Sequence, residues 1–143
     1  MDGELHMKYA EVMLQPEQIS MFADIIEQEE STRKVFFFIG KALKKQRSEE
    51  DSISGITIND IVENVTVERK TRLNKGRSNY TYNTSVTNIH RKTAEGIADK
   101  LLSMSLLYYQ SIKPYKFIFL TRRGVQILEE LLKRSKQTNT RSV

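Results

Sequence analysis

Cysteine is absent from this chain of 143 residues, and histidine occurs only twice, as His6 and His90. Without cysteine there is no disulfide and no thiolate metal site, and two distant histidines do not make a closed metal site. The sequence also lacks a glycine-rich phosphate loop, a nucleophile elbow and any metal-spaced cluster. We therefore expect a protein that is not an enzyme and that uses no cofactor and no metal ion.

Long apolar segments are missing as well. No apolar run approaches the roughly 20 residues that span a membrane, and the first residues, MDGELHMKYAEV, are too polar for a signal peptide. The expected location is the cytoplasm, with no membrane partner. With 38% hydrophobic residues, the chain can form one domain with its own core.

Positive charge is concentrated in one part of the chain. The net charge is +5, yet the window 66–92 alone holds seven Lys or Arg residues and one acid, Glu68. The segment 16–30 is the reverse, with five acidic residues and no basic one. Such a separation is not required of a generic solvated surface, and it favours an anionic partner for the basic window.

Two helices are predicted in the first third of the chain. Pro16 favours a helix start, and a narrow apolar stripe predicts a helix over 16–30. Ser31 or Thr32 is expected to cap a second helix over 31–45, and the polar segment 47–55 is expected to be a loop. We predict a flexible N-terminal arm over 1–15, a domain over 16–136 and a disordered tail over 137–143.

Three differently patterned segments follow one another in the stretch 86–132. The first is an amphipathic helix with apolar residues at i, i+3, i+4, i+7 and i+10, namely Ala94, Ile97, Ala98, Leu101 and Met104. The β-rich segments LYYQSIK and YKFIFLT then flank Pro114, which marks a turn because proline cannot occupy a central strand. Thr121 is expected to cap a final helix that runs to Lys136.

Upstream, the segment ITINDIVENV predicts a short strand-like entry, a cap at Thr57 or Asn59 and a short helix. With this helix in place, the chain resembles the MarR- and PadR-type winged-helix transcription regulators. TINDIVEN is similar to their first motif helix, IHRKTAEGIADKLLSMSLL to their recognition helix with its exit, and the run from Leu120 to Gly124 to their "LT..G" junction. The resemblance covers roughly residues 31–132.

The resemblance implies a fold that is mainly α with a small β wing (α+β), a winged helix-turn-helix with extra N-terminal and C-terminal helices. The sequence departs from that pattern twice. The segment 66–88 is far longer than the usual turn of about 3–4 residues between the motif helices. Ser105 also stands where a glycine is usual before the wing.

The long insert 66–88 contains two strand-like segments around Asn74-Lys75-Gly76-Arg77, which predicts a hairpin turn. A Lys/Arg-rich ribbon beside a recognition helix is the expected electrostatic footprint of a nucleic-acid partner, and this interpretation is favoured. A solvated loop whose charge only aids solubility remains the alternative.

Candidate DNA contacts lie in three places. The N-terminal residues of a recognition helix reach base edges, where Arg91 is suited to guanine. Asn88 and Thr87 are expected near the helix cap, and Gly96 costs about 1 kcal/mol relative to alanine in a helix. The full set comprises His90, Arg91, Lys92, Thr93, Glu95 and Gly96 in the helix, Arg69, Lys70, Arg72, Lys75 and Arg77 in the insert, and Lys113 and Lys116 in the wing.

These residues lead us to expect sequence-specific binding of double-stranded DNA by a homodimer, as a repressor-like transcription regulator that reads an inverted repeat. The candidate dimer contacts are the apolar residues of the first and last helices: Ile19, Phe22, Ile25, Ile26, Leu128, Leu131 and Leu132. Alternatives are a plasmid or phage partition or replication-control protein, and a winged-helix protein-interaction module. The sequence identifies no operator and no small-molecule effector.

Overall fold

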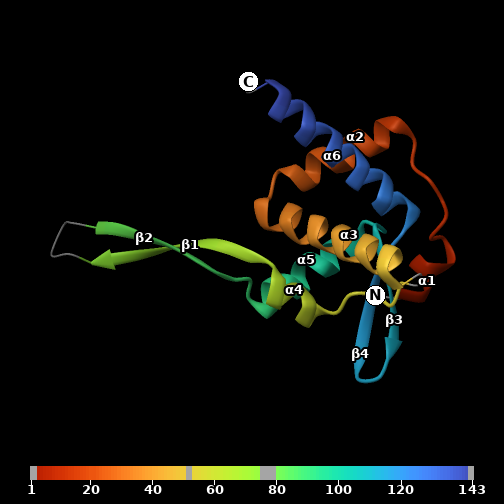
Figure 1. Ribbon diagram of the computed structural model, residues 1–143, viewed down its shortest axis with the longest axis horizontal. Coiled ribbons are helices and arrows are strands. Elements are labelled where there is room, and N and C mark those ends of the chain that lie inside the picture. Colours follow the sequence, from red (N-terminus) through yellow and green to blue (C-terminus); the bar gives the residue numbers. More distant parts are fainter. Residues whose placement is uncertain (1–2, 51–52, 75–79, 142–143) are drawn as a thin grey trace.

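A computed structural model describes residues 3–50, 53–74 and 80–141, and side chains within 5–49, 53–70 and 83–137. The described residues form six helices and two two-stranded antiparallel sheets (Figure 1). In chain order these elements are α1 (Gly3–Lys8), α2 (Pro16–Glu27), α3 (Glu30–Glu50), α4 (Ile58–Asn64), β1 (Thr66–Asn74), β2 (Tyr80–Asn88), α5 (Arg91–Ser103), β3 (Leu107–Ile112), β4 (Tyr115–Leu120) and α6 (Arg122–Arg141). The mixed α+β class is confirmed.

One hydrophobic core joins α3, α4, α5 and the first half of α6. Its largest fully buried side chains include Phe36 of α3, Ile61 of α4, Leu101 of α5 and Ile127 of α6. The apolar stripe predicted for α5 is the face that is buried, because its residues recur every three to four positions along the helix. The opposite face of α5 is therefore left to solvent.

The short helix α4 begins where the sequence predicts. Thr57 is its cap: the hydroxyl of Thr57 accepts a hydrogen bond from the Asp60 amide at 3.2 Å, and the Asp60 carboxylate accepts one from the Thr57 amide at 3.0 Å. The strand-like entry is reduced to one residue, since Ile56 pairs with Ile118 of β4 in an isolated antiparallel bridge. This bridge fixes the start of α4 to the second sheet.

The insert between α4 and α5 is the β1–β2 hairpin, in which Thr66 pairs with Asn88 and Asn74 with Tyr80. Nine residues per strand give a ribbon about 30 Å long, and it projects away from the domain (Figure 1). Asn88 does not cap α5; its side-chain amide donates to the Val62 carbonyl at 2.8 Å and so fixes the base of the ribbon to α4. The predicted turn, apart from Asn74, lies outside the described residues.

The second hairpin pairs β3 with β4, as predicted on either side of Pro114. Ser105, which replaces the expected glycine before this hairpin, has a φ of 59°, a left-handed conformation that glycine adopts more easily. Gly124 in the first turn of α6 is required for a different reason, because a Cβ there would lie 2.3 Å from the Leu106 carbonyl oxygen. The hydroxyl of Thr121 accepts the Gly124 amide at 3.1 Å, which confirms the predicted cap.

The described N-terminal residues pack on the domain, in the segment 1–15 for which the sequence predicts a flexible arm. Residues 3–8 form α1, which packs against β3. The guanidinium of Arg123, only 7% exposed, donates to the carbonyls of Tyr9 and Val12 at 2.7 Å each and to the carbonyl and hydroxyl of Ser105. Burial lowers the pKa of Arg123. This one side chain joins the N-terminal segment, the start of β3 and α6.

Two helices are longer than predicted. Helix α3 continues to Glu50, so residues 47–50 are helical and not part of a loop. Helix α6 continues to Arg141, beyond the predicted end at Lys136 and into the segment 137–143 for which a disordered tail is predicted. Helix α2, in contrast, ends at Glu27, and α3 begins at Glu30. Within the described ranges, no helix is sufficiently long and apolar to cross a membrane.

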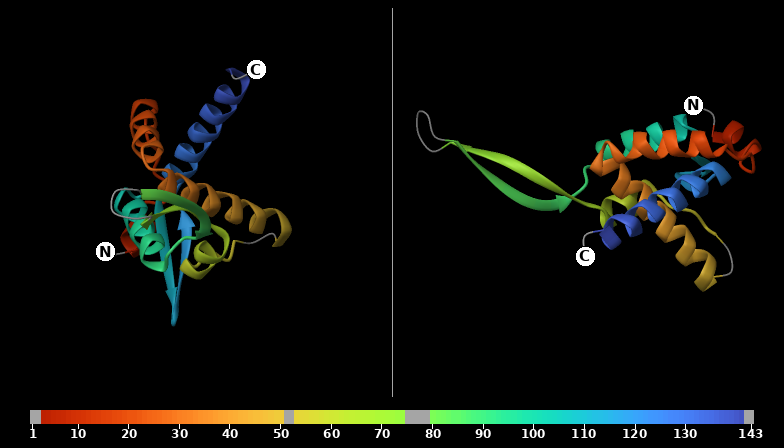
Figure 2. Two further views of the ribbon diagram at one scale, coloured as in Figure 1. Left: turned by 90° about the vertical axis from the view of Figure 1, so that its left-hand side faces the viewer. Right: turned by 90° about the horizontal axis from the view of Figure 1, so that it is seen from above.

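Helices α2 and α6 lie on the same side of the core, in contact with each other and with their axes inclined (Figure 2). Arg134 of α6 links them, with ion pairs to Asp24 at 2.7 Å and Glu27 at 3.2 Å. A hydrogen bond to Asp24 raises the pKa of Arg134 further. Much of the negative charge predicted in segment 16–30 is thus paired within the chain.

Candidate functional site

The exposed side of α5 has an outer ridge made by Lys92, Glu95, Gly96 and Asp99, all of which are exposed. The ridge stands opposite the buried Ile97 and Leu101 because the side chains repeat every 3.6 residues. A Cβ added at Gly96 would meet nothing within 4 Å, so the surface is open at this point. The ridge offers donors, acceptors and a backbone that a ligand can approach closely.

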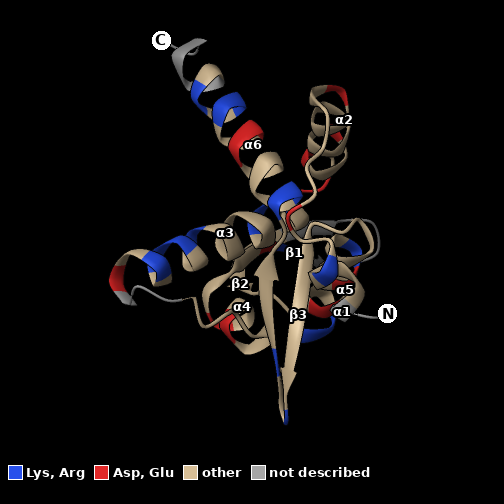
Figure 3. Cartoon of the chain, turned by 90° about the vertical axis from the view of Figure 1, so that its right-hand side faces the viewer, with Lys and Arg blue, Asp and Glu red and all other residues tan. Residues whose placement is uncertain are grey.

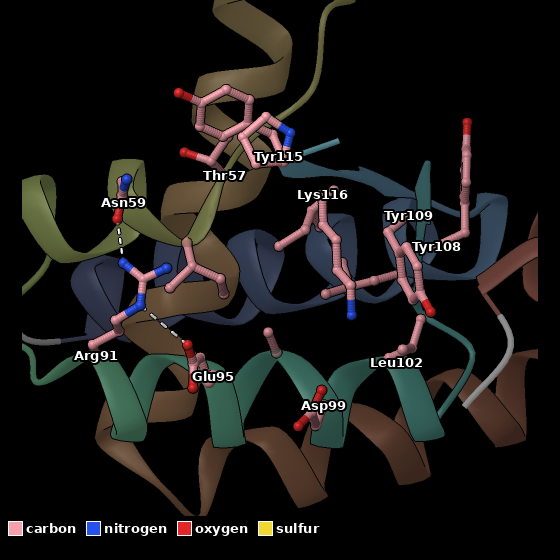
Figure 4. Close-up of a pocket in the computed structure, with 15 residues that line it drawn as sticks. Thr57, Asn59, Arg91, Glu95, Asp99, Leu102, Tyr108, Tyr109, Tyr115 and Lys116 are labelled. Atoms are coloured by element: carbon pink, nitrogen blue, oxygen red, sulfur yellow. Dashed lines mark hydrogen bonds and ion pairs between the residues drawn. The ribbon is translucent and has the colours of Figure 1, made fainter. Parts of the chain in front are cut away.

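Arg91 points toward α4 and not outward along the ridge (Figure 4). Its guanidinium donates to the Asn59 side-chain oxygen and forms an ion pair with Glu95, with Arg91 Nε 3.2 Å from Glu95 Oε1. His90 is the residue that precedes the helix and makes no side-chain cap hydrogen bond. Of the candidate residues in α5, Lys92 and Gly96 therefore face outward, while Arg91 faces a groove.

This groove, with a volume of about 450 Å³, lies between α5, the start of α4 and the second hairpin (Figure 4). Arg91 and Lys116 contribute positive charge to its lining, and Glu95 and Asp99 contribute negative charge. Lys116 Nζ lies 4.9 Å from the centre of the Tyr109 ring, close enough for a cation–π contact. Burial raises the pKa of Tyr108, which also lines the groove.

The remaining candidate contacts lie on the two hairpins. Lys70 is exposed and Arg69 half-buried on β1, and Arg72 belongs to the same strand, with its side chain outside the described residues. Lys75 and Arg77 also lie outside them. Lys113 is exposed in the turn between β3 and β4, and Lys116 follows on β4. The two hairpins leave the domain in different directions, with α5 beginning at the base of the first and leading into the second (Figure 1).

No known protein family, characterised protein or solved structure matches this chain. The geometry of the chain itself therefore carries the functional argument. Within the described residues no group of three or more metal-binding side chains comes together. What the site presents is an exposed helix ridge, a groove of mixed charge and two projecting hairpins, an arrangement of binding groups.

The candidate dimer residues divide into two sets. Ile26, Leu128 and Leu131 are buried inside the chain, and Ile19 and Phe22 are half-buried against the same core, so their burial requires no second copy. Ile25 and Leu132 remain exposed, at 40% and 48%. Met21, one helical turn before Ile25, is 49% exposed and was not among the predicted residues.

A second basic surface was missed by the sequence reasoning. The segment 33–47 contains six Lys or Arg residues and no acid. Its exposed members include Lys41, Lys44, Lys45 and Arg47 of α3. Figure 3 shows the Lys and Arg segments of α3 in blue. The three phenylalanines of the same helix predict only a buried face, whereas the spacing of Lys41, Lys44 and Lys45 at i, i+3 and i+4 is the signal that indicates this exposed surface.

Proposed function

We propose that this protein binds double-stranded DNA sequence-specifically as a homodimeric winged-helix protein, most simply a repressor-like transcription regulator. The observation that carries the proposal is the position of α5. Its exposed ridge, open at Gly96, lies between a long basic ribbon at its N-terminal end and a second hairpin at its C-terminal end. An α-helix of this kind fits the major groove, with the flanking ribbons beside the sugar–phosphate backbone.

The order of elements supports a winged helix. α3, α4 and α5 supply three helices on one core, the Ile56 bridge supplies a minimal first strand against β4, and β3–β4 is the wing. Ser105 at a positive φ and Gly124 beneath Leu106 occupy the two positions where the resemblance to MarR- and PadR-type proteins places special backbone requirements. The long β1–β2 ribbon is the part that differs from that pattern.

The contacts of Arg91 suggest that some residues of α5 contact bases and others contact phosphates. Lys92 and Gly96 are assigned to base edges, since they face outward on the ridge, while Glu95 holds Arg91. Arg91 is assigned to a phosphate, because Asn59 and Glu95 hold its guanidinium in the groove beside the wing. Lys116 across the groove is assigned to the same DNA strand.

Dimerisation is proposed through the exposed residues of α2 and α6. Met21, Ile25 and Leu132 form exposed apolar positions on helices that diverge from the core. A two-fold dimer places two copies of α5 on one side of a duplex, about one helical turn apart, and requires an inverted repeat.

The test is selection of binding sequences from a random duplex pool, followed by titrations with two variants. Lys92→Ala should weaken the selected site by about 1–3 kcal/mol and relax one base position. Arg91→Ala should weaken selected and random duplexes alike and reduce the slope of log affinity against log salt by about 0.9. Lys133→Ala on exposed α6 is the matched control. Failure of the pool to converge on any sequence would refute specific recognition.

A further inference from the structure

The exposed face of α3 carries a row of lysines that takes no part in the DNA contact proposed for α5. Lys41, Lys44 and Lys45 are exposed, and Arg47 follows them. Among the described residues, none of these four forms an ion pair. The described carboxylates instead pair with Lys34, Arg91, Lys100 and Arg134. We call Lys41, Lys44, Lys45 and Arg47 the α3 basic row.

The α3 basic row and the outer ridge of α5 face away from each other. The buried sides of α3, with Phe36 and Ile39, and of α5, with Ile97 and Leu101, belong to the same core. Since both helices turn their apolar sides inward, their exposed sides point in different directions, and the right-hand view of Figure 2 shows the two helices on different sides of the domain. The α3 basic row is therefore a surface separate from the ridge of α5.

The basic row continues toward the first hairpin. Lys34, about two helical turns before the row, is paired with Glu30 and has its Nζ 3.3 Å from the Thr66 carbonyl at the ribbon base. Lys70 follows on β1. From Lys34 to Lys45 the helix rises about 16 Å, a length of duplex axis that holds about five phosphates of one strand. The unpaired positive charge thus lies on the α3 basic row, and further Lys and Arg side chains lead from it to the first hairpin, an elongated arrangement that suits a polymer of regularly spaced anions.

The surroundings of the row favour nucleic acid over an acidic protein. None of the exposed large hydrophobic residues of the described chain belongs to α3, because Phe37 and Phe38 are half-buried against the core. Protein interfaces are depleted of lysine and rely on buried aromatic and aliphatic anchors, whereas protein–DNA interfaces are polar and strongly positive. The α3 basic row has the second composition.

We propose that the α3 basic row binds a second segment of double-stranded DNA through its phosphates, without sequence preference, so that the protein bridges two duplex segments. The bridging rests on the proposed function of α5, which holds the first segment. The contact of the α3 basic row with a duplex does not.

The experiment compares three variants of the full chain. The first is Lys41→Gln/Lys44→Gln/Lys45→Gln in the row, and the second is Arg91→Ala/Lys92→Ala on α5. The third is a charge-matched control, Lys8→Gln/Arg122→Gln/Lys133→Gln. All substituted side chains are exposed, and circular dichroism checks that each variant folds. Beads carrying the selected duplex are loaded with protein, and capture of a labelled random-sequence duplex of 30 base pairs is measured.

The wild-type protein and the control should capture the labelled duplex. The row variant should stay on the beads but capture at least tenfold less labelled duplex. On the random duplex, the slope of its log affinity against log salt should fall by up to two to three units, about 0.9 per lost phosphate contact. Capture equal to wild type by the row variant overturns the proposal. The proposal is also overturned if the row variant keeps the salt slope of the wild type on DNA but is no longer retained on a polyglutamate column. That result would identify an acidic protein as the partner.

The two proposals fail in different ways. If no duplex is selected and the α5 variant binds as wild type, specific recognition by α5 is refuted. A reduced salt slope of the row variant on the random duplex still supports the contact between the row and DNA in that case. If the α5 variant loses the selected site and the row variant bridges normally, the proposed function stands and the bridging proposal falls.

Discussion

The same substitution, glycine to alanine, should have opposite effects at two positions of this fold. At Gly96, in the middle of α5, an added Cβ meets nothing within 4 Å. At Gly124, in the first turn of α6, it would lie 2.3 Å from the Leu106 carbonyl oxygen and 2.9 Å from a Leu120 methyl carbon. Backbone atoms cannot yield as the end of a flexible side chain can, so the strain at Gly124 must move α6 or the start of β3.

The magnitudes follow from these contacts. Gly96→Ala removes the conformational entropy cost of a glycine within a helix and should raise the free energy of unfolding by about 0.5–1 kcal/mol. Gly124→Ala forces an overpacked contact and should lower it by about 1–3 kcal/mol. Urea denaturation followed by circular dichroism measures both, and equal m values would show that only stability has changed.

A measurement of DNA affinity distinguishes the effect of Gly96→Ala on binding from its effect on stability. If the duplex approaches the backbone of α5 there, Gly96→Ala should weaken the selected site by about tenfold, equivalent to about 1.4 kcal/mol, although the protein is more stable. Ser103→Ala, at an exposed position near the end of the same helix, is the control. A Gly96→Ala protein that is less stable than wild type would refute the open surface at α5, and unchanged affinity would remove Gly96 from the DNA contact.

Three further predictions concern contacts between separate segments of the chain and between two copies of it. Arg123→Met leaves the Tyr9 carbonyl without its buried donor and should cost about 1–3 kcal/mol, with faster hydrogen exchange in residues 5–14; unchanged exchange would contradict the clamp. The Lys100 ammonium lies 2.9 Å from Glu29 and lowers the pKa of that carboxyl. The small stabilisation by this ion pair should be present at neutral pH and lost as the pH falls below about 4.3 and the Glu29 carboxylate is protonated. The difference in unfolding free energy between wild type and Lys100→Gln should therefore vanish in acid, and a difference independent of pH would contradict the prediction. Ile25→Glu should give a monomer in sedimentation without loss of fold, and a wild-type protein that is already monomeric at micromolar concentration would contradict the dimer.

The local patterns of the sequence were sufficient for the elements around the site. The 3.6-residue recurrence of apolar residues predicted α5 and its buried face, Thr57 was one of the two residues predicted to cap α4, and Pro114 marked the turn of the second hairpin. These signals are local, because a cap or a turn depends on residues a few positions apart. The boundaries at Glu50 and Arg141 were missed because polar residues are compatible with both a helix and a loop.

Only the tertiary structure decided which side chains meet across the chain. Arg123 holds the Tyr9 and Val12 carbonyls more than 100 residues away, so a segment that reads as a polar arm is docked on the domain. Arg91 is turned toward Asn59 by a contact that no spacing within α5 predicts. The packing of α2 on α6 likewise buries, within one chain, apolar residues that were predicted to form a dimer interface. A sequence pattern fixes the face on which a side chain lies, whereas its partner depends on how separate elements pack, and that is determined only when the core is assembled.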